Sequence, residues 1–145
     1  MTTKIFEQSV VENPAVVGFM LMKNPNSFKV LSNPNKIIGP LKILAAKLRD
    51  VDRNKARSLL DLGDRLERAM NSANKDLADL RWITRPATRL NTIGAFSATV
   101  SRHPKYNDLV SFQRKLLEIG KLLVSIREKI LEVSKKHSQK KFWQN

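Results

Sequence analysis

The sequence predicts an all-α protein, a helical bundle with long amphipathic helices and an extended, proline-interrupted N-terminal arm. Two segments, residues 41–83 and 108–136, place apolar residues at alternating spacings of three and four, which is the period of a helix. No segment alternates apolar and polar residues as half-buried strands do, and no strand–helix rhythm indicates a parallel sheet. The chain has 145 residues, of which 41% are hydrophobic, enough for one core.

Residues 1–40 form the predicted arm. Four of the six prolines lie here, and three of them follow asparagine, a pair that favours turns, so we expect no long helix or central strand. Yet 17 of these 40 residues are apolar, so the arm must bury its side chains either on its own bundle or on a neighbouring subunit. In the second case, removal of the arm would abolish assembly and leave a folded bundle. The candidate assembly residues are Val16, Val17, Phe19, Met20, Leu21 and Phe28.

The bundle is expected over residues 41–137. Its first helical segment begins after Pro40, because proline suits the first turn of a helix. Helical spacing then continues to Leu80, with Lys55 as the one polar interruption. This segment is either one long helix or two helices broken near residues 50–54, and the sequence leaves both arrangements open.

Arg85-Pro86 ends or kinks that segment, because the residue before a proline avoids the α region. Between residues 87 and 101 we expect a short helix whose small residues would let another backbone approach closely. The last helix is predicted from about 108 to 136, with Asn107 as its N-cap. Residues 138–145 then form a basic and aromatic tail. The apolar stripe of the last helix comprises Leu109, Phe112, Leu116, Ile119, Leu123, Ile126, Ile130 and Val133.

The composition excludes several functional classes. The absence of cysteine excludes a disulfide scaffold, a thiolate nucleophile and a Cys-ligated zinc site. The five glycines are scattered, which excludes a P-loop or a dinucleotide fingerprint, and neither histidine has an acid or second ligand at useful spacing. No apolar stretch is long enough to span a bilayer. We therefore expect a non-enzyme with no catalytic residues, metal or cofactor.

The net charge of +14 points to a polyanionic partner, and it is unevenly distributed. Residues 84–107 and the last eleven residues each carry four basic groups and no carboxylate. In the first of these regions, arginines four apart are interleaved with threonines, and a guanidinium fork fits phosphate oxygens. The alternative is that Arg81 and Arg85 pair with Asp76, with Asp79 or with an acid of another subunit. The candidate phosphate-binding residues here are Arg81, Arg85, Arg89, Arg102 and Lys105, with Trp82 as a stacking residue.

Two further basic groups are candidates. The C-terminal lysines neutralise backbone phosphate without sequence readout, and a neighbouring aromatic can stack on bases. A second group of three arginines four apart shares one helical stripe, although Asp50, Asp52 and Asp61 lie close to it in sequence. These candidates are Lys135, Lys136, Lys140 and Lys141 with Trp143 for stacking, and Arg49, Arg53 and Arg57. No segment has the pattern of a helix-turn-helix, so we expect binding to follow the phosphate backbone and the shape of the nucleic acid and not its base sequence.

A proline-interrupted apolar arm (ENPAVVGFML, SNPNKIIGP) followed by a basic helical bundle resembles the major coat proteins of filamentous and rod-shaped archaeal viruses. The resemblance covers most of the chain, as architecture and composition. It implies a virion protein whose paired subunits wrap duplex DNA and associate through the arm, as identical copies or with a related coat subunit. Without it, the expected location is cytoplasmic.

Two other functions fit the same composition. One is a small helical subunit of a multi-subunit CRISPR effector, which is also short, basic and all-α but usually lacks a long apolar arm. The other is a protein–protein adaptor, in which the apolar stripe of the last helix binds a partner helix and the charge serves only solubility. The adaptor function predicts that neutral substitutions of Arg81, Arg85 and Arg89 leave nucleic-acid retention unchanged.

Overall fold

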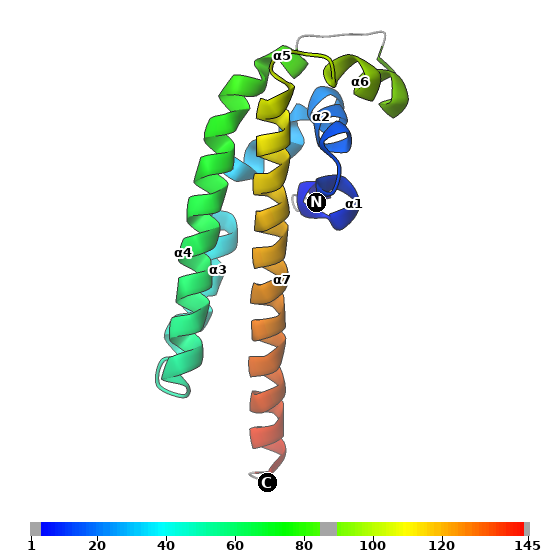
Figure 1. Ribbon diagram of the computed structural model, residues 1–145. Coiled ribbons are helices and arrows are strands. Elements are labelled where there is room, and N and C mark those ends of the chain that lie inside the picture. Colours follow the sequence, from blue (N-terminus) through cyan, green and yellow to red (C-terminus); the bar gives the residue numbers. More distant parts are fainter. Residues whose placement is uncertain (1–3, 85–89, 144–145) are drawn as a thin grey trace.

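The computed structural model describes residues 4–84 and 90–143, and the side chains of residues 4–83 and 90–135. Within these ranges all regular elements are helices, so the predicted all-α class is confirmed. Three long helices form the bundle: α3 (Asn35–Leu48), α4 (Arg53–Asp76) and α7 (Tyr106–Trp143). α4 and α7 lie side by side along the long axis of the molecule, and α3 packs behind α4 (Figure 1).

The apolar stripes predicted from the sequence form the core of this bundle. On α4, residues at helical spacing from Ala56 to Ala73 are buried, including Leu59, Leu66 and Met70. On α7, six of the eight stripe residues are buried, and Leu123 and Ile130 pack against the core while remaining partly exposed. The buried six are Leu109, Phe112, Leu116, Ile119, Ile126 and Val133.

The N-terminal segment differs from the expected extended arm, because residues 4–40 are mostly helical. It contains the 3-10 helix η1 (Lys4–Phe6), α1 (Gln8–Val11), α2 (Pro14–Lys23) and the 3-10 helix η2 (Pro25–Ser32). The Asn-Pro pairs begin helices here instead of making isolated turns. Asn13 shows the reason: its side-chain oxygen accepts a hydrogen bond from the Ala15 amide at 2.9 Å, while Pro14 takes the first helical position.

Pro40 does not begin a helix, as the sequence analysis expected, but lies inside α3. Pro34 precedes this helix, and Asn35 is its first residue. Proline within a helix crowds the residue before it, and here that residue is Gly39, which has no Cβ to clash with the proline ring. The predicted boundary at residue 40 therefore falls in the middle of a helix.

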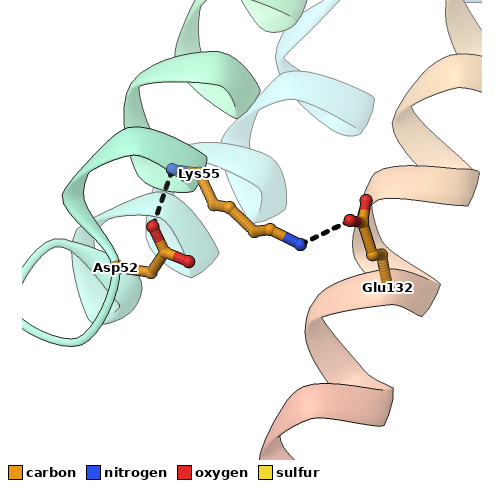
Figure 2. Close-up of polar contacts among 3 residues, drawn as sticks. All are labelled: Asp52, Lys55 and Glu132. Carbon is orange, nitrogen blue, oxygen red and sulfur yellow. Dashed lines mark hydrogen bonds and ion pairs between the residues drawn. The ribbon is translucent and has the colours of Figure 1, made fainter.

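The segment between residues 41 and 83 contains two long helices, because the chain turns between α3 and α4. Asp52 begins the second helix, and its carboxylate accepts a hydrogen bond from the Lys55 amide at 3.2 Å. Lys55, the polar interruption of the apolar stripe, reaches α7, where its Nζ lies 2.8 Å from Oε1 of Glu132 (Figure 2). A cation on the inner face of α4 is thus paired instead of being buried alone.

Three short helices lead from α4 to α7: the 3-10 helix η3 (Leu77–Leu80), α5 (Arg81–Thr84) and α6 (Ile93–Val100). α6 is the short helix expected between residues 87 and 101, but the close backbone approach lies elsewhere. A Cβ placed on Gly94 of α6 would meet no atom within 4 Å. On Gly18 of α2 it would lie 2.9 Å from both the Phe96 ring and the Leu109 side chain. Glycine at position 18 therefore lets α2 pack tightly against α6 and α7.

The last helix is longer than predicted at both ends. It begins at Tyr106, so Asn107 is its second residue and not its cap. It continues to Trp143, so residues 138–143 extend α7 instead of forming a separate tail. None of the helices in the described ranges combines the length and apolarity needed to cross a bilayer.

Candidate nucleic-acid interface

The arm residues proposed for assembly lie inside the molecule. Val17, Leu21 and Phe28 are buried, and the other three candidates, Val16, Phe19 and Met20, pack against the core while partly exposed. The Phe19 ring meets Phe96 edge to face, with centroids 5.7 Å apart. Of the two alternatives left open by the sequence, the segment folded over its own bundle is the one observed. A chain without residues 1–40 would therefore lose core side chains and would not remain a folded bundle.

The Arg81 region is built differently from the phosphate cluster that the sequence suggested. Trp82 is half-buried, and its ring stacks on that of His103 with centroids 4.0 Å apart and planes 7° apart. One face of the indole is thus already covered, and Trp82 is not a free stacking platform. Arg81 is exposed but already has an interaction partner. Arg85 and Arg89 lie outside the described residues.

Asp76, one of the alternative partners expected for Arg81 and Arg85, forms an ion pair with a lysine. The Asp76 carboxylate lies 2.7 Å from Nζ of Lys115 on α7, so this acid is already paired with a cation from another helix. The pair joins α4 to α7, and both side chains are less than half exposed. Asp76 therefore serves the bundle.

The corner between α6 and α7 presents two of the predicted phosphate-binding residues. Arg102 and Lys105 are both exposed, and neither forms an ion pair with a described carboxylate. Between them, Nδ1 of His103 accepts a hydrogen bond from the Lys105 amide at 3.0 Å, which fixes the turn. Together with the Trp82–His103 stack, this bond holds the corner in one conformation. We call Arg102 and Lys105 the α6–α7 basic corner.

A second group of exposed cations surrounds the turn between α3 and α4, at the opposite end of α4 (Figure 1). None of them forms an ion pair within the described part of the chain. Two of the nearby acids are engaged elsewhere, since Asp52 caps α4 and Asp61 lies 3.4 Å from Arg65. Asp50 remains exposed in the turn. This α3–α4 basic surface comprises Lys42, Lys47, Arg49, Arg53 and Arg57.

Sequence reasoning missed the lysines of this surface, although a signal was present. Between Glu12 and Asp50 the chain has no carboxylate over 37 residues, a longer acid-free interval than the one from Asp79 to Asp108. The boundary expected at residue 40 falls inside this interval and divides it between the predicted arm and the predicted bundle. Lys42, Lys47 and Arg49 lie on α3 and at its C-terminal end, and the predicted Arg53 and Arg57 lie on the first two turns of α4, which follows after the α3–α4 turn.

The C-terminal lysines lie on the last turns of α7. Lys135 is exposed. The side chains of Lys136, Lys140, Lys141 and Trp143 are outside the described residues.

The predicted cations do not converge on a single site. The α3–α4 basic surface lies near the beginning of α4, and the α6–α7 basic corner lies beyond its end (Figure 1). α4 has 24 residues, which correspond to about 36 Å of helix. The candidate interface thus has two parts, which lie near opposite ends of α4.

Comparison of the chain with models of known protein families, with curated protein sequences and with solved structures finds no match. No three His, Asp or Glu side chains lie close enough to share a metal ion in the part of the chain that the structure describes. The candidate function therefore rests on the two basic surfaces themselves.

Proposed function

We propose that this protein is a non-enzymatic structural protein that binds the backbone of duplex DNA without reading its sequence and self-associates to coat it. The observation that carries the proposal is the contrast between two kinds of cation. Lys55, Arg65 and Lys115 are paired with carboxylates, whereas the α3–α4 basic surface and the α6–α7 basic corner are exposed and make no ion pair with the described residues. Cations without local anions attract polyanions and release counterions when they bind phosphate.

The spacing of the two surfaces favours duplex DNA. They are separated by the length of α4, about 36 Å, and a helical turn of duplex DNA repeats its groove and phosphate positions about every 34–36 Å. We propose that both surfaces contact the backbone of one duplex on successive turns. Affinity should accordingly rise steeply when the duplex is lengthened from about half a turn to about two turns.

The role of a coat protein follows from the resemblance to the coat proteins of filamentous and rod-shaped archaeal viruses. It requires contacts between subunits in addition to contacts with DNA. Since the arm candidates are covered by the chain's own helices, such contacts must use another surface.

The test compares three double variants, each of which lowers the formal net charge of +14 by two. Arg53→Gln/Arg57→Gln affects the α3–α4 basic surface, and Arg102→Gln/Lys105→Gln affects the α6–α7 basic corner. The matched control, Arg65→Gln/Lys115→Gln, removes two cations that are already paired with carboxylates. Binding to a fluorescent duplex of about 24 base pairs is measured for each at low salt.

We expect each of the first two variants to weaken binding by about five- to tenfold and the control by less than about twofold, because paired cations contribute less to the external field. Equal losses in all three would mean that only net charge matters, and the assigned surfaces would be wrong. Stronger binding to single strands or RNA–DNA hybrids would favour the CRISPR subunit instead.

A further inference from the structure

One face of α7 is covered near the start of the helix and exposed further along. Gln113 donates a hydrogen bond from Nε2 to the Val11 carbonyl, and a Cβ on Gly120 would lie 3.0 Å from the Phe6 carbonyl oxygen. η1 and α1 therefore cover α7 at positions 113 and 120. Residues four or eleven apart lie on nearly the same helix face, so Val124, four after Gly120, and Leu131, eleven after it, continue this face beyond η1. Their side chains are 49% and 54% exposed, respectively.

This exposed part of α7 borders an apolar groove of about 530 Å³. Leu123 and Ile130 line it from α7, and Phe6 lines it from η1. In Figure 1, α4 lies along one side of the lower half of α7, and no labelled helix lies on the opposite side below α1. The bundle is thus one helix short at this end. Exposed apolar side chains that flank a groove mark an interaction surface.

We propose that the occupant is a second copy of this chain, which packs the same part of its α7 antiparallel against the first. Charge complementarity identifies this partner. Arg127 and Glu128 are adjacent, exposed, and lie midway between Val124 and Leu131. In an antiparallel pair with its two-fold axis at this midpoint, Val124 faces Leu131 of the second copy and Arg127 faces Glu128 of the second copy. The face is thus complementary to itself, as a two-fold interface requires.

In the same antiparallel alignment, the two ends of the α7–α7 contact are also complementary in charge. Position 120, which η1 covers, would lie opposite Lys135 of the second copy. Glu7 lines the groove beside this position and is exposed. Lys135 of one copy would then pair with Glu7 of the other, so this lysine serves assembly instead of phosphate binding. Because α7 continues to Trp143, the two helices must cross at an angle that lets the end of each α7 clear η1 of the other copy, and the helix–helix contact is limited to about four turns.

An interface of this length is small. Stable complexes bury about 1,200–2,000 Å² in total, and smaller interfaces are typical of weak, reversible association. We therefore expect a monomer–dimer equilibrium at concentrations of about 1–100 µM. The inference deepens the self-association in the proposed function, but it is tested without nucleic acid. Its failure leaves DNA binding intact, and loss of DNA binding leaves the dimer intact.

The experiment is a charge swap analysed by sedimentation equilibrium of the full chain in buffer free of nucleic acid. Arg127→Glu leaves four acids and no arginine at the two-fold axis of each pair, and Glu128→Arg leaves four arginines and no acid there. Each variant alone should raise the dimer dissociation constant by about tenfold. An equimolar mixture of the two should dimerise at least as well as the wild type, since every contact across the axis is again between opposite charges. Arg114→Glu, an exposed α7 residue outside the contact with the same change in charge, is the matched control.

A disulfide test determines whether the two α7 helices pair antiparallel or parallel. The chain contains no cysteine, so any disulfide that forms joins the introduced residues. A mixture of Val124→Cys and Leu131→Cys should form the mixed disulfide on mild oxidation, whereas each variant alone should form little. A wild-type chain that remains monomeric at about 100 µM would overturn the proposal. So would a mixed charge-swap sample that stays monomeric, or a Val124→Cys variant that preferentially forms a disulfide with a second copy of itself, which indicates a parallel pair.

Discussion

Substitution of Gly18 by alanine tests most sharply whether the N-terminal segment packs against its own bundle. Gly18 is buried in α2, where a Cβ would lie 2.9 Å from Cδ2 of Leu109 and 2.9 Å from two atoms of the Phe96 ring. Phe96 is 1% exposed and Leu109 is fully buried, so neither side chain has free space to move into. The added methyl group must displace these two side chains or move α2 away from α6 and α7.

The expected magnitude combines two opposing contributions. Overpacking a core costs about 1–3 kcal/mol, and replacing glycine by alanine within a helix returns about 0.5–1 kcal/mol. We therefore expect Gly18→Ala to lower the free energy of unfolding by about 1–2 kcal/mol. For a chain of this size, this corresponds to a decrease in Tm of about 3–6 °C.

Gly94→Ala in α6 is the matched control, because a Cβ at this position meets no atom within 4 Å. It should leave Tm unchanged or raise it by about 1–3 °C. Urea and thermal unfolding followed by circular dichroism at 222 nm measure both variants. In the background of Phe96→Leu, which removes part of the ring, Gly18→Ala should cost less than it does in the wild type. If Gly18→Ala is as stable as Gly94→Ala, α2 is not packed as described and the assignment of the arm to its own bundle is refuted.

Three further predictions concern the polar groups within the bundle and the DNA contacts. Glu132→Gln should lower the free energy of unfolding by about 1–2 kcal/mol, because it leaves the Lys55 ammonium, whose side chain is 14% exposed, without its charged partner. Lys55→Met, which removes the buried charge itself, should be neutral or stabilising in the same urea titration; a larger loss than for Glu132→Gln would contradict this account. Gln113→Leu should cost about 1–2 kcal/mol, since the Val11 carbonyl loses its donor, and faster hydrogen exchange in α1 would accompany the loss. Duplexes of about five base pairs should bind far more weakly than duplexes of about 20 base pairs, because a short duplex reaches only one basic surface. Equal affinities for the two lengths would argue against contacts at both basic surfaces.

The helical period was the most informative feature of the sequence. On α7 it predicted the core side, and six of the eight stripe residues are buried, because burial on a long amphipathic helix follows directly from spacing. It also marked Lys55 as an exception, but the partner, Glu132, lies on another helix and 77 positions away along the chain. Such pairings depend on tertiary packing and have no local signature.

The proline-rich segment was the least predictable part. The same Asn-Pro pair can make a turn or begin a helix, and tertiary contacts decide between them. Here the apolar side chains that surround Phe28 are buried by the bundle, so short helices form between the prolines. A boundary between arm and bundle was expected at residue 40, but Pro40 lies inside α3, which begins at Asn35. That boundary divided the acid-free interval to which Lys42 and Lys47 belong.

The candidate site was predicted in its residue types but not in its arrangement. The acids close to Arg49, Arg53 and Arg57 in sequence are obvious partners for them, yet Asp52 and Asp61 interact with other groups. Trp82 was expected to stack on bases, whereas its ring stacks on His103, a residue 21 positions away. Spacing along a helix identifies which residues share a face, but it does not show which of them a neighbouring helix uses.

The salt dependence of binding to two duplexes of unrelated sequence measures the central claim most directly. If exposed cations at the two basic surfaces contact the sugar–phosphate backbone, the logarithm of the binding constant should fall linearly with the logarithm of salt concentration, with a slope of about −4 to −6 for both duplexes. A slope shallower than about −1, or affinities that differ more than about tenfold between the two sequences, would contradict it.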